Sequence, residues 1–455
     1  MSYITINPAT EEKIKEHAFD SAQDVERAVV LSVKAHSQWR KTPLTERLRA
    51  VEALEQALRA ERASLARLMT TEMGKLERDS LSEIDKSISS CASLRELYPR
   101  WKQDLEYQLP SGFKVVREPL GVLLGIMPWN FPLWQVLRFA VPAILSGNSV
   151  LLKHAPCTWG SSELIAKIFA AAFPEGLLIN LKVDLPMVAQ LIADPRVRGV
   201  SLTGSRAAGM SVGGVAGAHL KKCVLELGGS DPYIILDDAD LEMAVTTCVT
   251  SRLINAGQSC VSAKRFIVVR KNAQEFTERF CTQMAGKKIG DPLLSSTDLG
   301  PLARQDLRAQ LAAQVSRSVH QGSTLMLGGQ VPASGKGYYY PPTVLANVKP
   351  GQVAFDEELF GPVAAICTVE NETQALEWAN RSPFGLGAAI FTRDIERGLK
   401  LAQHEVEAGM VFINDFVRSD VTVPFGGLKD SGLGRELGRE GAFEFTEIKT
   451  LFAKI

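Results

Sequence analysis

The sequence predicts an α/β protein with two parallel sheets whose strands alternate with helices. Short apolar runs alternate with helix-length segments from Leu120 onward, and a second series of the same kind follows Gly229. The segment before Tyr98 instead has the three- and four-residue apolar spacing of amphipathic helices. Alternation of strands and helices indicates right-handed βαβ units, so ligands are expected at the carboxyl ends of the strands.

The N-terminal segment is predicted to be helical. Thr42 and Pro43 mark a helix start, because proline is favoured at the first helical position. Apolar residues from Leu44 to Met69 then recur mostly three or four apart, which predicts one buried helix face. Residues 98–118 are polar and aromatic without a helical period, and we expect a hairpin or a connector there.

The first alternating series forms the first sheet. Its expected strands are residues 120–126, 149–153, 177–183, 199–203 and 222–226. Its expected helices are residues 133–145, 160–173, 185–193 and 206–217. Each apolar run is short enough for a strand, and each intervening segment is long enough for a helix that crosses back over the sheet.

The second series predicts another α/β domain that begins near Ser230. Its expected strands are residues 232–236, 265–269, 363–369 and 410–413, with helices at 240–255 and 273–285 among others. The tail, residues 443–455, is strand-like, and we expect an exposed edge that pairs elsewhere.

Composition narrows the function classes. The chain has 455 residues, with 51 Lys+Arg against 51 Asp+Glu, so its formal net charge is zero. A chain without net positive charge has no overall electrostatic attraction for polyanions such as nucleic acids. No stretch reaches the ~18 apolar residues that a bilayer span requires, and no signal peptide is visible. We therefore expect a cytoplasmic protein without nucleic-acid or membrane partners.

Cysteine and histidine usage excludes several kinds of site. Seven cysteines are sparse and none has C-x-x-C spacing, which predicts free thiols in a reducing compartment. The six histidines show no spacing typical of metal ligands, so we expect no metal site. A G-x-S-x-G motif is also absent, which argues against a serine hydrolase.

Cys260 is the candidate nucleophile. It lies in a small-residue loop, Asn-Ala-Gly-Gln-Ser-Cys, directly after an expected helix. A thiol there can be exposed and activated, whereas Cys248 lies in an apolar stretch and should be inert. The alternative is that Cys260 is a buried filler, as most single cysteines are.

Two polar residues at strand ends are candidates for acid–base and oxyanion chemistry. Glu226 ends an apolar run before two glycines, and partial burial there raises a carboxyl pKa toward the range of a general base. Asn130 lies in a turn held by Pro128 and Pro132, where an amide can be a preorganised donor. The alternatives are a solvated strand-end carboxylate and ordinary turn chemistry.

A turn with Gly204 and Ser205 joins an expected strand to an expected helix, and Gly209 follows in that helix. Backbone N–H groups at such a helix N-terminus suit a phosphate. The sequence is neither G-x-G-x-x-G nor a P-loop, and glycine at strand ends often serves as a plain turn. Lys153 is the last residue of another expected strand, where it either contacts a ligand or is solvated.

These fragments, in this order, closely resemble the aldehyde dehydrogenase superfamily. The resemblance runs from about Ile6 to the C-terminus. Its matching segments are residues 128–132, Lys153, 203–209, 226–229, 257–260, 357–362, Asn414 and 424–432. Single fragments are weak signals, but eight in register make the match specific.

The resemblance implies an aldehyde dehydrogenase-like α/β fold of three parts. A Rossmann-like cofactor domain comprises residues 1–103 and 120–228, and a catalytic domain comprises residues 229–428. An oligomerisation hairpin, residues 104–119, joins the C-terminal strand segment 429–455 and extends a neighbouring subunit's sheet. Dimers or dimers of dimers are usual in this family, so a homodimer or homotetramer is expected.

The family's chemistry implies one role for each catalytic candidate. Cys260 attacks an aldehyde carbon as thiolate, and Asn130 and the Cys260 backbone N–H hold the oxyanion. Hydride passes to a nicotinamide and leaves a thioester. Glu226 then activates the water that releases the acid.

The resemblance also implies a dinucleotide site. Lys153 is assigned to the adenosine ribose, Ser205 to the pyrophosphate, and Glu358 to the nicotinamide ribose. Phe360 and Trp129 border the nicotinamide pocket. The full set of expected cofactor-binding residues is Trp129, Lys153, His154, Gly204, Ser205, Gly209, Leu227, Glu358 and Phe360.

One departure from the family bears on cofactor choice. Many NAD-preferring members have a glutamate three residues after the ribose lysine, where this chain has Pro156. Without that carboxylate, a 2′-phosphate meets less repulsion. His154 either hydrogen-bonds the ribose or caps the strand. We expect NAD to be preferred and NADP to be accepted.

The substrate class rests on arginines. Arg138 stands where succinate-semialdehyde dehydrogenases have an arginine that binds the substrate carboxylate, eight residues after Asn130 and on the same helix face. Their following lysine is Phe139 here, and their second arginine is Ile254. Arg252 and Arg418 are possible substitutes, and the alternative for Arg138 is a solvated helix arginine.

The chain therefore resembles the bacterial succinate-semialdehyde dehydrogenases, and oxidation of succinate semialdehyde or a similar carboxylate-bearing aldehyde is the expected activity. Three alternatives stay open at this point. They are a dehydrogenase for other aliphatic or longer semialdehydes, a CoA-acylating dehydrogenase, and a non-catalytic binding or structural protein on the same fold.

Overall fold

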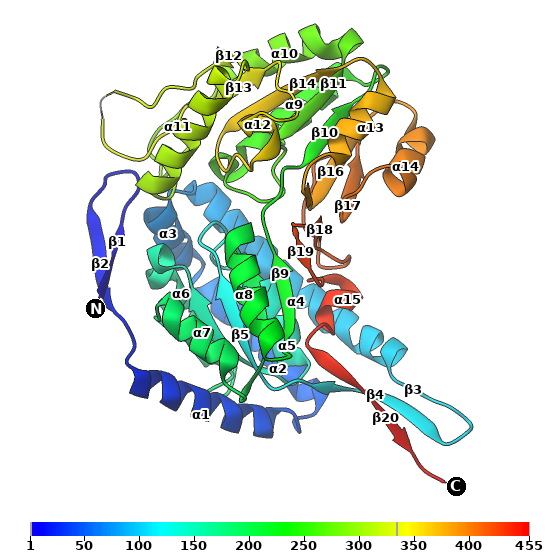
Figure 1. Ribbon diagram of the computed structural model, residues 1–455. Helices are drawn as coiled ribbons and strands as arrows, with labels where there is room; N and C mark the ends of the chain where they lie inside the picture. Colours follow the sequence, from blue (N-terminus) through cyan, green and yellow to red (C-terminus); the bar gives the residue numbers. More distant parts are fainter. Residues whose placement is uncertain (1, 334, 455) are drawn as a thin grey trace.

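Two sheets with helices on both faces organise the chain, as Figure 1 shows. The computed structural model describes residues 2–333 and 335–454. The first sheet has six strands in the order β19-β9-β8-β5-β6-β7. These are β5 (Val122–Met127), β6 (Ser149–His154), β7 (Leu178–Asn180), β8 (Val197–Thr203), β9 (Lys222–Glu226) and β19 (Gly432–Leu433). All but β19 run parallel, and the predicted parallel sheet is confirmed.

Alternate residues of the first sheet face two different helix layers, as the two-residue period of a strand requires. Leu123 packs in one core with α2 (Leu44–Ala60), α4 (Glu77–Leu105), α5 (Trp134–Leu145) and α6 (Trp159–Ala172). Leu124 packs in another core with α1 (Ala22–Trp39), α7 (Leu185–Ala193) and α8 (Arg206–Ala218). The four helices predicted between these strands all form at the expected places.

The second sheet has seven strands in the order β12-β13-β14-β11-β10-β16-β17. They are β10 (Pro232–Ile235), β11 (Arg265–Val269), β12 (Thr324–Leu327), β13 (Thr343–Ala346), β14 (Val363–Val369), β16 (Gly387–Phe391) and β17 (Met410–Ile413). One face carries α9 (Leu241–Leu253) and α10 (Arg270–Ala285). The other carries α11 (Gln305–His320), α12 (Val353–Asp356), α13 (Glu372–Asn380) and α14 (Ile395–His404).

The N-terminal prediction of helix throughout is wrong for its first residues. β1 (Ser2–Ile6) and β2 (Lys13–Ala18) form an antiparallel hairpin whose alternating polar residues leave it largely exposed. The apolar face predicted after Pro43 is confirmed, but a break at Glu61 divides it into α2 and α3 (Arg62–Met73). Helix α4 also continues through Pro99 into the predicted connector.

A three-stranded sheet, β20-β4-β3, projects from the body of the molecule (Figure 1). It pairs β4 (Phe113–Pro119) with β3 (Tyr107–Gln108) and with β20 (Thr446–Phe452). The segment 429–455 is more divided than expected. β18 (Leu428–Lys429) pairs with β15 (Phe384–Gly385), β19 joins the first sheet and α15 (Gly438–Ala442) follows, so only β20 belongs to the hairpin.

Two further findings concern the chain as a whole. All seven cysteines are free, as the sequence predicted. Among the described residues, none of the helices has both the length and the apolar character that a membrane span requires.

Candidate active site

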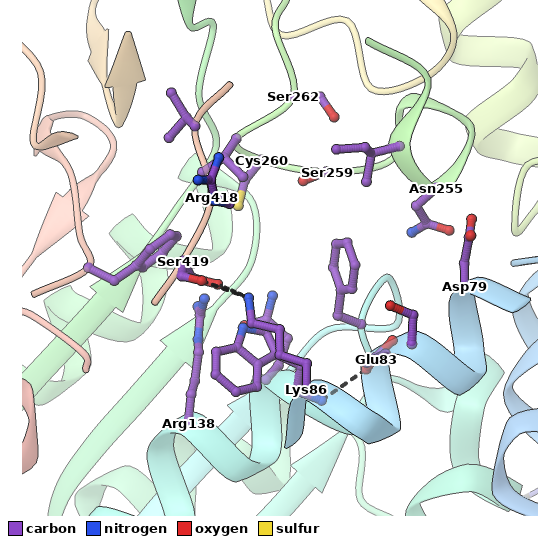
Figure 2. Close-up of a pocket in the computed structure, with 18 of the residues that line it drawn as sticks. Asp79, Glu83, Lys86, Arg138, Asn255, Ser259, Cys260, Ser262, Arg418 and Ser419 are labelled. Atoms are coloured by element: carbon purple, nitrogen blue, oxygen red, sulfur yellow. Dashed lines mark hydrogen bonds between the residues drawn. The ribbon is translucent and has the colours of Figure 1, made fainter. Parts of the chain in front are cut away.

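A cavity of about 340 Å³ lies between α4, the start of α5, the Cys260 loop and residues 416–425. Figure 2 shows the side chains that converge on it from these separate parts of the chain. Cys260 lines the cavity, and so do two predicted substrate-binding residues, Arg138 and Arg418. Three predicted site residues that are far apart in the chain therefore share one cavity.

The Cys260 loop has an unusual backbone. A short 3₁₀ turn, η2 (Ile254–Gly257), precedes it, and Asn255, Ala256 and Gly257 have φ values of 52°, 53° and 76°. Left-handed conformations strain non-glycine residues, and they persist where surrounding contacts hold them. Gly257 has no such penalty, and a Cβ there would lie 2.2 Å from the Gly361 carbonyl oxygen. The loop thus approaches the segment before β14 closely.

Buried hydrogen bonds hold this strained loop in place. Arg252 donates to the Gly257 carbonyl at 2.7 Å, and Asn255 donates to the Asn130 carbonyl at 2.8 Å. Lys264 donates to the Cys260 carbonyl at 2.7 Å and to those of Ser259 and Ser262 at 3.1 and 3.3 Å. These contacts fix the position of the thiol, and sequence reasoning missed Asn255 and Lys264.

Arg252 therefore differs from its predicted role. It was expected to bind substrate, but its side chain is fully buried and does not line the cavity. Burial lowers the pKa of its guanidinium to about 10. The Arg252 side chain donates its hydrogen bond to the Gly257 carbonyl and lies outside the cavity lining, so Arg252 supports the Cys260 loop and is not placed to bind substrate.

Cys260 is half-buried at the cavity wall. Burial raises the pKa of its thiol to about 12, while the positive charges of Arg138 and Lys264 act in the opposite direction. The fully buried Cys248 has its thiol pKa raised well above the usual value by burial alone. Only Cys260 combines access to the cavity with cationic neighbours, which is the environment of a reactive cysteine.

Glu226 ends β9 and is buried, at 2% exposure. Neither of its carboxylate oxygens has a hydrogen-bond partner among the described residues. Burial raises the pKa of this carboxyl well above its usual value; Arg138 opposes the rise and the nearby Glu436 adds to it. An unpartnered buried carboxyl with a raised pKa has the properties expected of a general base.

Asn130 is buried where the first sheet meets the Cys260 loop. Its amide nitrogen donates to the Gln258 carbonyl at 3.0 Å, and its amide oxygen has no partner among residues 2–333 and 335–454. Together with the Asn255 contact to its backbone, this places the Asn130 carboxamide beside the Cys260 loop. The position agrees with the predicted oxyanion role.

Arg138 is buried at the inner wall of the cavity, at 3% exposure. It forms an ion pair with Glu436 and donates to the Thr203 hydroxyl at 3.2 Å. Its guanidinium also lies 4.7 Å from the ring centre of Phe425. The alternative of a solvated helix arginine is therefore excluded, but the charge of Arg138 already has a carboxylate partner, Glu436, which sequence reasoning missed.

Arg418 is half-exposed and pairs with Asp415 at 2.6 Å, while its side chain borders the same cavity. Lys86, on α4, is a further cavity residue that sequence reasoning missed. Its ammonium donates to the carbonyl and hydroxyl oxygens of Ser419 at 2.8 and 2.7 Å. A lysine on one face of a polar helix carries no motif that singles it out in the sequence.

The expected phosphate-binding turn has the predicted form. Ser205 is exposed at the N-cap of α8, and its hydroxyl accepts from the Ala208 amide at 3.3 Å. The Gly204 amide donates to the Glu226 carbonyl, which ties this turn to the end of β9. A Cβ on Gly209 would lie 2.5 Å from Leu227, so glycine there lets α8 pack closely on that residue.

Lys153 and His154 end β6 but differ in access. Lys153 is 7% exposed, and burial lowers the pKa of its ammonium. His154 is fully buried: Nε2 donates to the Pro132 carbonyl at 3.0 Å, and Nδ1 lies 2.9 Å from the Thr158 hydroxyl in η1 (Pro156–Thr158). The structure therefore corrects the expected ribose contact, because both ring nitrogens of His154 are used in capping the strand.

Three other expected cofactor residues gather near the domain junction. A Glu358 carboxylate oxygen accepts from the Gly229 amide at 3.1 Å and pairs with Lys264 at 3.3 Å. Phe360 meets Trp129 edge to face, with ring centres 5.7 Å apart. Glu358, which is expected at the nicotinamide ribose, is thus linked to the Cys260 loop through Lys264.

Comparisons with known proteins place the whole chain among relatives of one family. A succinate semialdehyde dehydrogenase [NAD(P)+] from Escherichia coli (strain K12) is 48% identical over 452 residues, which cover 99% of this chain and 97% of the relative. A probable succinate-semialdehyde dehydrogenase [NADP(+)] from Synechocystis is 42% identical over 99% of this chain and the whole relative.

Solved structures and a family model extend the agreement. The crystal structure of succinic semialdehyde dehydrogenase from Streptococcus pyogenes in complex with NADP+ superposes with a TM-score of 0.96 at 34% identity, covering 99% of both chains. The model of the aldehyde dehydrogenase family matches residues 2–451. The chain belongs to the aldehyde dehydrogenase family.

Proposed function

We propose that this enzyme oxidises succinate semialdehyde, or a similar aldehyde bearing a carboxylate, to the acid with NAD(P) as the hydride acceptor. One observation carries the proposal: the cavity that holds Cys260 is lined by four basic side chains and only two acidic ones, Asp79 and Glu83. The basic residues are Lys75, Lys86, Arg138 and Arg418. A cavity of this charge favours an anionic substrate. The relatives named above support the same substrate class.

Acylation begins at Cys260. The thiol loses its proton to solvent water, and the thiolate sulfur bonds to the aldehyde carbon, whose carbonyl electron pair moves to oxygen. The Asn130 amide and the Cys260 backbone N–H stabilise this oxyanion. A nicotinamide dinucleotide, when bound, accepts the hydride of the same carbon, which leaves a thioester on Cys260.

Deacylation depends on Glu226. As carboxylate it removes a proton from water, and the hydroxide oxygen bonds to the thioester carbon. The carbon–sulfur bond then breaks, Cys260 leaves as thiolate, and the carboxylic acid is released. Burial and the absence of hydrogen-bond partners keep the Glu226 carboxyl reactive in this step.

The surface along the first sheet fits a dinucleotide. Ser205 offers an exposed helix N-terminus for the pyrophosphate, and Lys153 lies at the end of β6 for a ribose. Two exposed apolar side chains, Leu185 and Met210, lie in the first turns of α7 and α8 and suit the faces of an adenine ring. Glu358 would hold the nicotinamide ribose, and a Cβ on Gly228 would lie 2.3 Å from its carboxylate, so a larger residue there would displace that carboxylate.

The expected cofactor preference rests on Pro156, three residues after Lys153, the residue assigned to the adenosine ribose. Pro156 supplies no carboxylate to repel a 2′-phosphate, so both NAD and NADP are accepted. The relatives named above include an NAD(P)+ enzyme and a probable NADP(+) enzyme. The preference for NAD over NADP stays a prediction.

A panel of aldehydes with each cofactor tests the proposal. Reduced nicotinamide is followed by absorbance with succinate semialdehyde, glutarate semialdehyde, butanal and hexanal. The expected result is the highest kcat/KM with succinate semialdehyde and free succinate as product. An equal or higher value with butanal contradicts the substrate class, and a CoA requirement for turnover contradicts hydrolytic release.

The projecting β-sheet supports a homo-oligomer. Phe113, Ile448 and Phe452 on β4 and β20 are large apolar side chains that are 41–62% exposed. Apolar strands at an exposed edge favour pairing with another chain. Light scattering measures the mass; a homodimer or homotetramer is expected, and a monomer at micromolar concentration contradicts this assembly.

A further inference from the structure

The four basic side chains that line the cavity are not equivalent. Three of them have a carboxyl group within ion-pair distance. These pairs are Lys75–Glu83, Arg138–Glu436 and Arg418–Asp415. Lys86 is different, because no carboxylate among residues 2–333 and 335–454 forms an ion pair with its ammonium. Its ammonium is therefore open to pairing with an incoming anion.

The surroundings of Lys86 hold its ammonium at the cavity wall. Both of its hydrogen bonds go to neutral oxygens of Ser419, and its ammonium lies 4.4 Å from the ring centre of Trp134. Figure 2 shows Lys86 reaching from α4 toward Ser419, with Arg138 beside it. Because the Ser419 hydroxyl accepts from Lys86, its own hydrogen is left to donate. Ammonium and hydroxyl together form a donor pair for a carboxylate.

We propose that Lys86 is a specificity-determining residue, whose ammonium binds the substrate carboxylate with the Ser419 hydroxyl while the aldehyde carbon lies at Cys260. The inference rests on the proposed oxidation of a carboxylate-bearing aldehyde and names the residue that recognises the carboxylate. It adds a residue to the expected Arg138, whose guanidinium pairs with Glu436 and lines the same cavity. A charged hydrogen bond in a partly buried site gives strong discrimination between charged and uncharged substrates.

The charge of Lys86 depends on pH within the working range. Burial lowers the pKa of its ammonium to about 8. The positive charges of Arg138 and Arg418 also lower it, and Asp420 and Glu83 act in the opposite direction. Lys86 is therefore protonated below pH 8 in the free enzyme and loses its charge as pH rises above that value. Recognition of a carboxylate should weaken over the same range.

The test measures kcat/KM for succinate semialdehyde and for butanal, which has the same chain length and no charge. Their ratio is determined from pH 6.5 to 9.5 for the wild type, Lys86→Met, Lys86→Arg and Ser419→Ala. The ratio cancels the ionisations of Cys260 and Glu226, which both substrates require. Lys34→Met, on the exposed side of α1, is the control for loss of a lysine charge.

Wild-type selectivity is expected to fall as pH rises above 8. At pH 7, Lys86→Met is expected to lower the ratio at least about tenfold and to abolish its pH dependence. Lys86→Arg should retain selectivity and keep it to higher pH, and Ser419→Ala should lose part of it. Butanal turnover shows whether each variant has folded.

The outcomes separate this inference from the proposed function. If the wild type does not prefer succinate semialdehyde, the proposed function fails. If it does, but Lys86→Met lowers kcat/KM equally for both aldehydes, Lys86 only anchors the Ser419 loop and the inference is overturned. If Lys86→Met does not fold, a wild-type selectivity that stays constant from pH 6.5 to 9.5 overturns it as well.

Discussion

The ammonium of Lys264 lies 2.7 Å from the carbonyl oxygen of Cys260, the proposed nucleophile. The same ammonium contacts the carbonyls of Ser259 and Ser262 and pairs with Glu358 at 3.3 Å. One buried lysine thus joins the loop of the nucleophile to the residue expected at the nicotinamide ribose. If Glu358 binds the nicotinamide ribose as predicted, this contact couples cofactor binding to the position of the thiol.

Lys264→Met should therefore impair both stability and chemistry. The substitution leaves buried carbonyls without their charged donor, so the free energy of unfolding should fall by about 1–3 kcal/mol, as measured by denaturant titration. We also expect kcat to fall at least about tenfold, because the thiol is less well oriented. The alkylation rate of Cys260 by iodoacetamide should change too. Exposed Lys271, which bonds only the Asp237 carbonyl, provides the control Lys271→Met; equal effects of the two variants contradict the positioning role.

The two candidate thiols give a matched pair of variants. Cys260→Ala should reduce turnover below detection, because no other described cysteine lines the cavity. Cys248→Ala should keep activity and lose about 1 kcal/mol of stability, since it removes one buried atom from an apolar core. Steady-state assays and thermal unfolding measure both. Normal turnover by Cys260→Ala would rule out the thioester mechanism.

Activity should rise with pH because both reacting acids have raised pKa values. Burial raises the pKa of the Cys260 thiol to about 12 and that of the Glu226 carboxyl well above its usual value. Each group acts in its deprotonated form, so kcat/KM for butanal should increase from pH 6 to 9. A profile that falls over this range contradicts the assignment.

Glu226→Gln isolates the second of these groups. The amide cannot accept a proton from water, so acylation should occur and the thioester should accumulate. Rapid mixing should show one equivalent of reduced nicotinamide followed by turnover slower by at least about 10²-fold. Retention of full steady-state turnover by Glu226→Gln would assign the base to another residue, for which the neighbouring Glu436 is a candidate.

Local periodicity accounts for what the sequence predicted well. The apolar runs that became β5, β6, β8 and β9 lie within a few residues of their predicted ends, because strands buried on both faces are continuously apolar. The β1–β2 hairpin was missed since its residues are polar and mostly exposed. Strand β19 was missed because two residues carry no period, and its place depends on the contact of Gly432 with β9.

Site residues that stand in sequence motifs could be predicted, and those placed only by tertiary packing could not. Cys260, Glu226 and Asn130 stand in recognisable segments, and the structure brings them to one region. Lys86 reaches the cavity, and Glu436 reaches Arg138, only through tertiary contacts, so no local pattern marks either residue. Arg252 was misassigned for the same reason, since its helix turns the guanidinium away from the cavity.

Arg252→Met tests that reassignment. The loss of the Gly257 contact should destabilise the left-handed loop by about 1–3 kcal/mol and lower kcat for every aldehyde. Because Arg252 does not line the cavity, KM for succinate semialdehyde and for butanal should change by the same factor. Kinetics on both aldehydes measure this, and a selective rise in KM for succinate semialdehyde would restore Arg252 to the substrate site.

Pro156→Glu tests the basis of cofactor choice. Pro156 begins η1, three residues after Lys153, and is half-exposed. A carboxylate there should repel a 2′-phosphate and accept hydrogen bonds from ribose hydroxyls, so the ratio of kcat/KM for NADP to that for NAD should fall at least about tenfold. Pro156→Gln has the same shape without the charge and should move the ratio much less. If both variants change it equally, backbone rigidity from proline, and not the missing charge, determines which dinucleotide is accepted.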